Sequence, residues 1–277
     1  HKSISQIKKG IEEGIREGCE KLVLSGGEPT IHPDFLEIVR MGREAGYKEI
    51  QIITNGRMLA YRKFLSEAIK NGLNEINFSI HAHTSELSDF LSGIKGGFQQ
   101  SINGLKNAIN SGVWVQVKIV LNNKNLRHLA EIINYFTGLG VKNFEILNLV
   151  PEGNAWKNRK ELFFDMEVHT GYLCSVFQMM KDRNAVLNLN RFNSGQFRKF
   201  IDVEQQALKK FNELSIRKKD FLGLPEGGEF PCFGEKCRYC FIRDECNIIR
   251  KSILTGKKGN LEMDSLSKII KEVIKDN

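Results

Sequence analysis

LSGGEPT at residues 24–30 follows directly on an apolar run, and this stretch decides how the fold is predicted. The run at residues 22–24 is typical of a buried strand, so a glycine pair and a carboxylate stand at its carboxyl end. Parallel sheets bind their ligands at this end of their strands. Gly26 and Gly27 let a ligand approach the backbone closely, and Glu28 offers an acceptor. The stretch predicts a site for a charged small molecule, with a plain strand-to-helix turn as the alternative.

Outward from this stretch, the spacing of apolar residues alternates between the helical and the strand period. Such alternation is typical of consecutive strand–helix units around a parallel sheet. Because parallel strands joined by right-handed crossovers all point the same way, their carboxyl ends gather on one rim. The pattern therefore predicts an α/β fold whose rim is the active site. The expected strands are residues 21–24, 49–53, 75–80, 115–121 and 144–149.

Each expected strand ends in polar or glycine residues. After the third strand, His81 and His83 point to the same face if the strand continues. Histidines there can meet substrate or donate a proton, but rim histidines with satisfied hydrogen bonds are equally common, so both are secondary catalytic candidates. The five rim segments are SGGE at 25–28, TNG at 54–56, SIHAH at 79–83, NNKN at 122–125 and LVPEG at 149–153.

The size and charge of the chain limit its class and its partners. A length of 277 residues with 41% hydrophobic residues fits one main domain with an appendage. No apolar stretch approaches the ~20 residues that span a bilayer, so we expect a cytoplasmic protein without a membrane partner. The chain has a net charge of +8, and ten of its lysines and arginines lie at residues 181–219. Acidic residues alternate with them and few aromatics are interleaved, which disfavours a nucleic-acid partner.

The ordered rim segments resemble those of the radical S-adenosylmethionine (radical SAM) superfamily over roughly residues 1–155. LSGGEPTIHPDF, IITNG, INFSIHAH, VKIVLNNKN and NLVPEGNA are similar to the family's strands two to six, in order. The resemblance implies a partial (β/α)6 TIM-like barrel. It also implies an oxidoreductase of the maturase type, which cleaves S-adenosylmethionine (SAM) reductively to a 5′-deoxyadenosyl radical for hydrogen abstraction from a substrate.

The resemblance further implies which residues bind the cofactor. The GGE segment would hold the methionine amino group, since an ammonium that leaves water needs an anionic or carbonyl partner. The TNG turn and Ser79 would face the carboxylate and ribose, Asn122 would meet them from the other side, and Val150 would pack near adenine. Turn chemistry is the alternative for the short polar residues. The implied cofactor-binding residues are Gly26, Gly27, Glu28, Thr54, Asn55, Ser79, Asn122 and Val150.

The family's three-cysteine loop, CxxxCxxC, occurs nowhere in this sequence. That loop belongs on the family's first strand, which would lie upstream of His1. Without three thiolates and an open iron site, a [4Fe-4S] cluster cannot chelate and cleave SAM. A helix-first opening and a first residue other than methionine favour a missing segment, so we expect the loop to precede this sequence.

A second cysteine cluster lies near the carboxyl end, in PCFGEKCRYCFIRDEC. Cys232, Cys237, Cys240 and Cys246 are close enough to surround one metal centre, and either zinc or an iron–sulfur cluster would suit four thiolates. Disulfides are the third possibility, although such spacing in a cytoplasmic protein more often binds metal. The cluster resembles part of the SPASM or twitch extension, which implies one auxiliary [4Fe-4S] cluster.

These patterns predict three parts: residues 1–157 as the partial barrel, 158–230 as a mostly helical connection, and 231–277 as a small cysteine-rich metal-binding extension with a final helix. The expected substrate is a peptide or a small anionic molecule, and the resemblance implies an electron donor such as flavodoxin or ferredoxin. The alternative function is a non-catalytic binding module with a degenerate barrel and a structural zinc knuckle.

Overall fold

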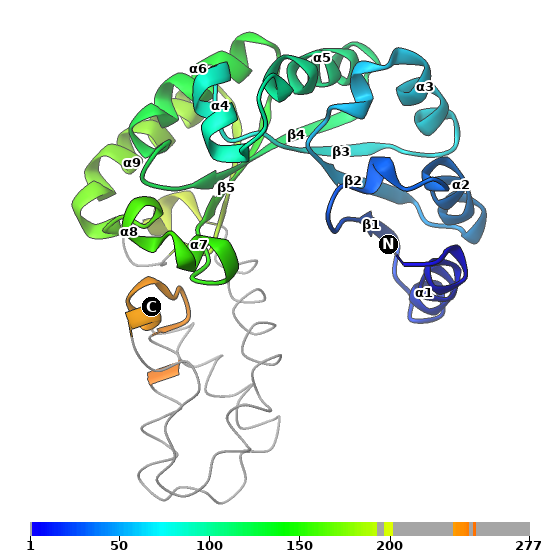
Figure 1. Cartoon of the computed structure of the whole chain (residues 1–277), viewed down its shortest axis with the longest axis horizontal. Coiled ribbons are helices and arrows are strands. Elements are labelled where there is room, and N and C mark those ends of the chain that lie inside the picture. Colours follow the sequence, from blue (N-terminus) through cyan, green and yellow to red (C-terminus); the bar gives the residue numbers. More distant parts are fainter. Residues whose placement is uncertain (1, 193–196, 202–234, 244–245, 248–277) are drawn as a thin grey trace, which may run out of the picture. The chain divides into compact units, whose positions relative to one another are not determined.

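The computed structural model describes residues 2–192, 197–201, 235–243 and 246–247 (Figure 1). A six-stranded sheet runs in the order β1-β2-β3-β4-β5-β6, and the pairs from β1 to β4 are parallel. The α/β fold and the five expected strands are confirmed. The strands are β1 Lys21–Leu24, β2 Glu49–Thr54, β3 Glu75–Ser79, β4 Trp114–Leu121, β5 Asn143–Asn148 and β6 Val186–Asn190.

The helices connect successive strands, and Figure 1 shows α2, α3 and α5 along one side of strands β1 to β4. Their limits follow local signals: the Ser3 side chain caps the first helix in a capping box with Gln6, and Gly46 ends the second in the left-handed conformation, φ 103°. The helices are α1 Ile4–Arg16, α2 Phe35–Ala45, α3 Arg62–Lys70, α4 Ser85–Ser92, α5 Gly97–Asn110, α6 Leu129–Gly138, α7 Gly153–Lys157, α8 Arg159–Leu162 and α9 Met166–Asp182.

The two faces of the sheet differ in polarity. On the face that packs against helices, α2 approaches closely: a Cβ on Gly42 would come within 2.5 Å of the Leu22 side chain and 3.3 Å of Ile50. The alternate positions of the strands form the inner face, and many are polar. The buried residues of the outer face include Ile50, Ile52, Ile76, Phe78, Val117, Ile119, Phe144 and Ile146, and the inner face carries Gln51, Asn77, Gln116, Lys118 and Glu145.

Strand β6 is an addition to the five expected strands. It lies within the segment expected to be mostly helical, directly after α9. Leu187 and Leu189 alternate there with Asn188 and Asn190, which is a strand period. The five-strand prediction missed this signal because the run is short and follows a long helical pattern.

The described residues form two compact units, which we treat separately. The first comprises those of His1–Ile146 and Gln178–Leu187, and the second those of Leu147–Phe177 and Asn188–Asn277. The three-part division drawn from the sequence stays a prediction. Within the described part of the chain, none of the helices combines the length and the apolar content that crossing a bilayer requires.

Candidate functional site

The ends of β1 and β2 are joined by one carboxylate. Glu28 Oε1 accepts hydrogen bonds from the Thr30 amide at 3.1 Å and from Thr54 Oγ1 at 2.7 Å, and Oε2 accepts from the Asn55 amide at 2.7 Å. The Thr30 hydroxyl donates to Oε1 as well. Glu28 is half-buried, so these bonds are only partly exposed to competing water. The carboxylate therefore holds the GGE loop in place, and its role as partner of an ammonium stays a prediction.

The glycine pair beside Glu28 is open. A Cβ added to Gly26 or to Gly27 would meet no atom within 4 Å. Gly26 has φ 139°, a conformation that side chains rarely adopt. By contrast, a Cβ on Gly56 in the next rim segment would come within 2.5 Å of the Phe78 ring. The backbone of the glycine pair can therefore be reached by a ligand, whereas the Gly56 turn is packed.

The TNG turn uses its own polar side chains. Thr54 Oγ1 accepts from the Gly56 amide at 3.0 Å while it donates to Glu28, and Asn55 Oδ1 accepts from the Arg57 amide at 2.9 Å. Thr54 is 2% exposed. Both side chains thus have structural roles in the turn, and their direct contact with a cofactor stays a prediction.

Asn125 is a rim residue that the sequence analysis did not single out. It is fully buried, and its Nδ2 donates to the carbonyls of His81 and Val120, both at 3.0 Å. Its Oδ1 accepts from the Asn122 amide at 2.9 Å. Asn122 in turn accepts from the Lys124 amide and donates to the Val120 carbonyl. The asparagine-rich NNKN segment was the available signal, since asparagine commonly bonds to nearby backbone in turns.

His81 ties the end of β3 to β4. Its Nδ1 accepts a hydrogen bond from the Val120 amide at 3.2 Å. Burial lowers the pKa of His81 to about 4, against the opposing effect of a hydrogen bond to the Lys118 carbonyl. The ring is therefore neutral near pH 7, and the geometry supports a bracing role better than that of a proton donor.

His83 and Ser79 remain available for other roles. Burial, and then the neighbouring His128 ring at a centroid distance of 5.7 Å, lower the pKa of His83. Its Nδ1 is buried with no hydrogen-bond partner in the described residues. Ser79 is half-buried at the end of β3, with Lys118 as its register partner on β4. Both candidate roles stay predictions.

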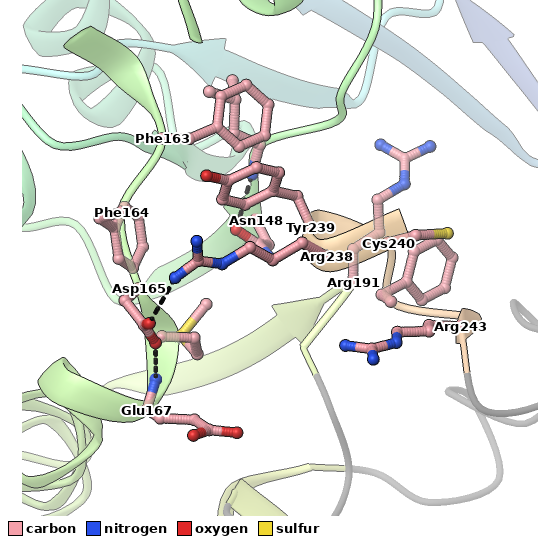
Figure 2. Close-up of a pocket in the computed structure, with 13 residues that line it drawn as sticks. Asn148, Phe163, Phe164, Asp165, Glu167, Arg191, Arg238, Tyr239, Cys240 and Arg243 are labelled. Carbon is pink, nitrogen blue, oxygen red and sulfur yellow. Dashed lines mark hydrogen bonds and ion pairs between the residues drawn. The ribbon is translucent and has the colours of Figure 1, made fainter. Parts of the chain in front are cut away.

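The second unit holds a cavity of about 500 Å³ (Figure 2). Arg191, Arg238 and Arg243 line it together with Cys240. Arg238 pairs with Asp165 at 3.1 Å, and this hydrogen bond lowers the pKa of Asp165. Three guanidinium groups against two lining carboxylates, those of Asp165 and Glu167, leave the cavity positive.

Two further features mark this cavity. Arg191 has φ 63°, which is strained for a residue with a side chain, and its guanidinium lies 5.9 Å from the Phe241 ring centroid. The Phe163 and Tyr239 rings pack against each other in its wall, tilted by 56° and with ring centroids 4.6 Å apart. Such a surface suits an anionic ligand with an apolar or aromatic portion.

The carboxyl-terminal cysteines are described only in part, because Cys232 lies outside the described residues. Cys246 is buried, and Cys237 and Cys240 are half-buried. A tight turn links Cys237 to Cys240, because the Cys240 amide donates to the Cys237 carbonyl at 3.2 Å. Among the residues that the structure describes, no three histidine, cysteine or acidic side chains are grouped to hold a metal. The four-cysteine metal site stays a prediction.

Val150, which is expected to pack near adenine, lies in the same unit and is half-buried. Its contact with the cofactor stays a prediction.

Two curated relatives of this chain are named probable GTP 3′,8-cyclase. The chain is 34% identical over 177 residues to the probable GTP 3′,8-cyclase of Sulfurisphaera tokodaii, covering 64% of this chain and 52% of that protein. It is 35% identical over 140 residues to the probable GTP 3′,8-cyclase of Saccharolobus islandicus, covering 49% and 44%. The chain thus spans about half the length of the curated relatives it matches.

Solved structures share the fold. Streptococcus suis SuiB bound to S-adenosylmethionine matches with a TM-score of 0.57 at 17% identity, over 71% of this chain and 43% of that chain. Native anSMEcpe with bound AdoMet and Kp18Cys peptide matches with a TM-score of 0.53 at 19% identity, over 68% and 55%. Residues 1–136 match the family described as the Radical SAM superfamily. By this match, and by the order of the rim segments on a parallel sheet, residues 1–136 of this chain belong to the radical SAM superfamily.

Proposed function

We propose that this chain acts in an enzyme that cleaves SAM reductively, to a 5′-deoxyadenosyl radical that abstracts hydrogen from a substrate. The observation that carries the proposal is the open glycine pair at the carboxyl end of β1. A Cβ would find empty space at Gly26 and at Gly27, and the backbone there can receive an amino-acid-like group. The adjacent Glu28 carboxylate accepts four hydrogen bonds, from Thr30, Thr54 and Asn55.

The remaining rim residues fit the same cofactor. Ser79 is half-buried, and its hydroxyl can bond to a ribose or carboxylate oxygen. Thr54 and Asn55 stabilise the turn after β2, and Asn122 stabilises the turn after β4. Val150 would offer an apolar contact to adenine. The thiolates for the [4Fe-4S] cluster would come from a CxxxCxxC loop, which this sequence does not contain.

The test uses the complete natural polypeptide, purified without oxygen. About four irons per cluster and formation of 5′-deoxyadenosine after reduction with dithionite are expected, measured by iron assay and mass spectrometry. Gly27→Val should reduce SAM binding at least tenfold, because its side chain would occupy the cofactor's place. Gly10→Val, on the exposed surface of α1 where a Cβ also meets nothing within 4 Å, is the matched control.

Failure of the wild-type protein to bind SAM or to form 5′-deoxyadenosine would count against the enzyme. An iron-free protein that binds zinc would instead support the alternative, a non-catalytic binding module with a structural zinc knuckle.

For the substrate we propose an anionic molecule, either a peptide or a nucleotide. The arginine-lined cavity of the second unit supports an anionic group of either kind. The relatives named probable GTP 3′,8-cyclase favour a nucleoside triphosphate. Comparing SAM consumption in the presence of GTP and of an acidic peptide distinguishes the two, because only a substrate should raise the rate.

We also propose that Cys232, Cys237, Cys240 and Cys246 hold one auxiliary [4Fe-4S] cluster. The CxxC turn at Cys237 and Cys240 supports a shared metal centre. About eight rather than four irons per chain would be expected, and zinc in place of the second four irons would contradict the auxiliary cluster. A flavodoxin or ferredoxin would supply electrons, and an oxygen-poor cytoplasm would suit both clusters.

A further inference from the structure

The inner face of the sheet in the first unit carries polar residues where apolar ones are expected. Strands of parallel sheets and the interiors of (β/α) barrels are typically filled by Val, Ile and Leu. Here β3 places Asn77 and Ser79 on this face, and β4 places Gln116 and Lys118 beside them in register. Glu145 of β5 contacts Lys118. Buried polar groups lower stability unless they are paired, so each one calls for a partner.

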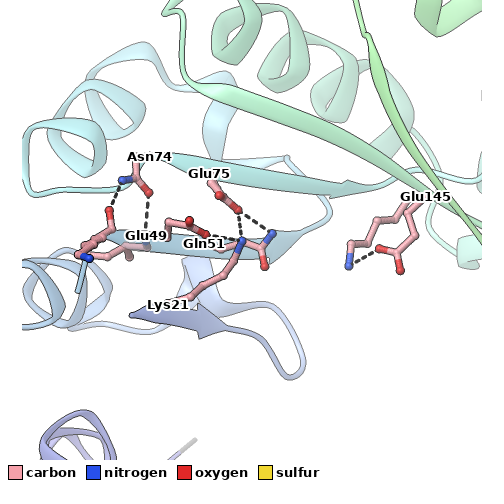
Figure 3. Close-up of polar contacts among 9 residues, drawn as sticks. Lys21, Glu49, Gln51, Asn74, Glu75 and Glu145 are labelled. Atoms are coloured by element: carbon pink, nitrogen blue, oxygen red, sulfur yellow. Dashed lines mark hydrogen bonds and ion pairs between the residues drawn. The ribbon is translucent and has the colours of Figure 1, made fainter. Parts of the chain in front are cut away.

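One part of this face is satisfied internally. Lys21 pairs with Glu49 at 3.0 Å and also with Glu75, and Gln51 Nε2 donates to Glu75 at 3.1 Å. Figure 3 shows these four side chains meeting across the neighbouring strands β1 to β3. Because every member has a partner, this network needs no ligand to explain it.

Asn77 is the next inner-face residue of β3 after Glu75, toward the carboxyl end of the strand. Its side chain, unlike those of the network, is not fully paired. It is 1% exposed, and its Oδ1 has no hydrogen-bond partner in the described residues. Its register partners are Ile53 and Gln116. A leucine, which has the same branched arrangement of heavy atoms, would avoid the desolvation penalty of a bare acceptor. The retained Oδ1 therefore points to a donor that is supplied by a bound molecule.

The neighbouring ion pair indicates the charge of that molecule. Lys118 Nζ lies 2.7 Å from a Glu145 carboxylate oxygen, with side chains 17% and 8% exposed (Figure 3). Such a buried pair adds little stability compared with apolar residues, so its presence also suggests a role in binding. Since the two charges neutralise each other, they favour a neutral group that both donates and accepts hydrogen bonds.

We propose that Asn77, Lys118 and Glu145 form a substrate subsite for a neutral polar group with an N–H or O–H that donates to Asn77 Oδ1. A peptide amide and a nucleoside hydroxyl or base N–H share this chemistry. The inference rests on the proposed function and deepens it, because Ser79, the expected SAM contact, lies on the same strand and face, two residues beyond Asn77. It assigns this part of the barrel to the neutral portion of the substrate.

The test compares Asn77→Leu with Gln51→Leu in the complete polypeptide loaded with SAM. N-acetylglycinamide and guanosine serve as probes in saturation-transfer NMR, and Tm is measured on the same samples. We expect one probe to bind the wild-type protein. With Asn77→Leu, the signal of that probe should be at least tenfold weaker, and the Tm of this variant should equal or exceed that of the wild type. Gln51→Leu should keep the signal and lower the Tm, because it breaks the satisfied network.

The probe that binds identifies the source of the donor, amide or nucleoside. Three results would overturn the subsite: signal retained in Asn77→Leu, a Tm of that variant below the wild type, or no signal from either probe with wild-type protein. SAM binding is measured by equilibrium dialysis on the same samples. It distinguishes a failure of the subsite from a failure of the proposed function. SAM binding without probe binding removes the subsite alone, whereas absent SAM binding removes the proposed function.

Discussion

Two side chains at the rim bond to backbone far away in the sequence as well as to nearby residues. Glu28 reaches the Asn55 amide, 27 residues on, and Asn125 reaches the His81 carbonyl, 44 residues back. Side chains that are expected to touch a cofactor therefore also hold the loops that would surround it. A change at such a residue should affect stability and cofactor binding together.

Glu28→Gln should lower the free energy of unfolding by about 2 kcal/mol, because one amide oxygen and an NH2 group cannot replace two accepting oxygens. Urea unfolding measures this. Glu37→Gln is the matched control, since Glu37 lies on the exposed surface of α2 and bonds only to Arg40 among the described residues. The control should show no measurable change, and equal losses in both variants would contradict the bracing role.

Stability should depend on pH through His81. Its pKa is lowered from 6.5 to about 4 in the folded protein, so the unfolded chain takes up a proton first as the pH falls. The contribution of the neutral His81 ring to the free energy of unfolding is complete above pH 6.5. It is lost as the pH falls to 4, a decrease of about 3 kcal/mol. Unfolding measured across this range should be less pH-dependent in His81→Gln. Parallel curves for the two proteins would show that the ring titrates normally.

At the scale of elements, strand ends are fixed in pairs. Glu28 joins β1 to β2, and His81 with Asn125 joins β3 to β4. Parallel strands cannot be linked by tight hairpins, so their carboxyl ends depend on such side chains for their relative position.

Asn125→Ala should lower the free energy of unfolding by about 3 kcal/mol, because it removes three hydrogen bonds from a fully buried position. The Asn122 amide should exchange its hydrogen faster. Asn123→Ala, at an exposed position in the same turn, serves as the control. Unchanged exchange at Asn122 in the Asn125 variant would argue against the brace.

At the scale of the whole molecule, two compact units carry different chemistry. The first presents open glycine backbone, neutral polar side chains and ion pairs at its sheet, and the second presents a positive cavity. With a net charge of +8, the chain as a whole favours anionic ligands, and salt should weaken that preference.

Arg243→Gln should weaken binding of pyrophosphate about fivefold and make it less sensitive to salt, because it removes one of three arginines from the cavity. Titration calorimetry at low and at physiological ionic strength measures both effects. Lys70→Gln, an exposed lysine of α3 in the first unit, should change neither. Equal losses in the two variants would mean that the probe senses only net charge.

The strand order, the rim segments and the family could all be predicted from the sequence. Apolar periodicity is a local consequence of burial, so β1 to β5 and the glycine pair could be located without coordinates. Apolar periodicity did not reveal β6, because the alternation of apolar and polar residues in that strand is short.

Which polar groups have hydrogen-bond partners could be seen only in the folded structure. Glu28 and His81 are engaged, Asn125 links two strand ends, and Asn77 Oδ1 is left without a hydrogen bond in the described residues. These outcomes depend on where distant segments return to the same rim, because a hydrogen bond needs two atoms within about 3 Å. Local sequence sets the face on which a side chain lies, whereas its partner is set by chain topology.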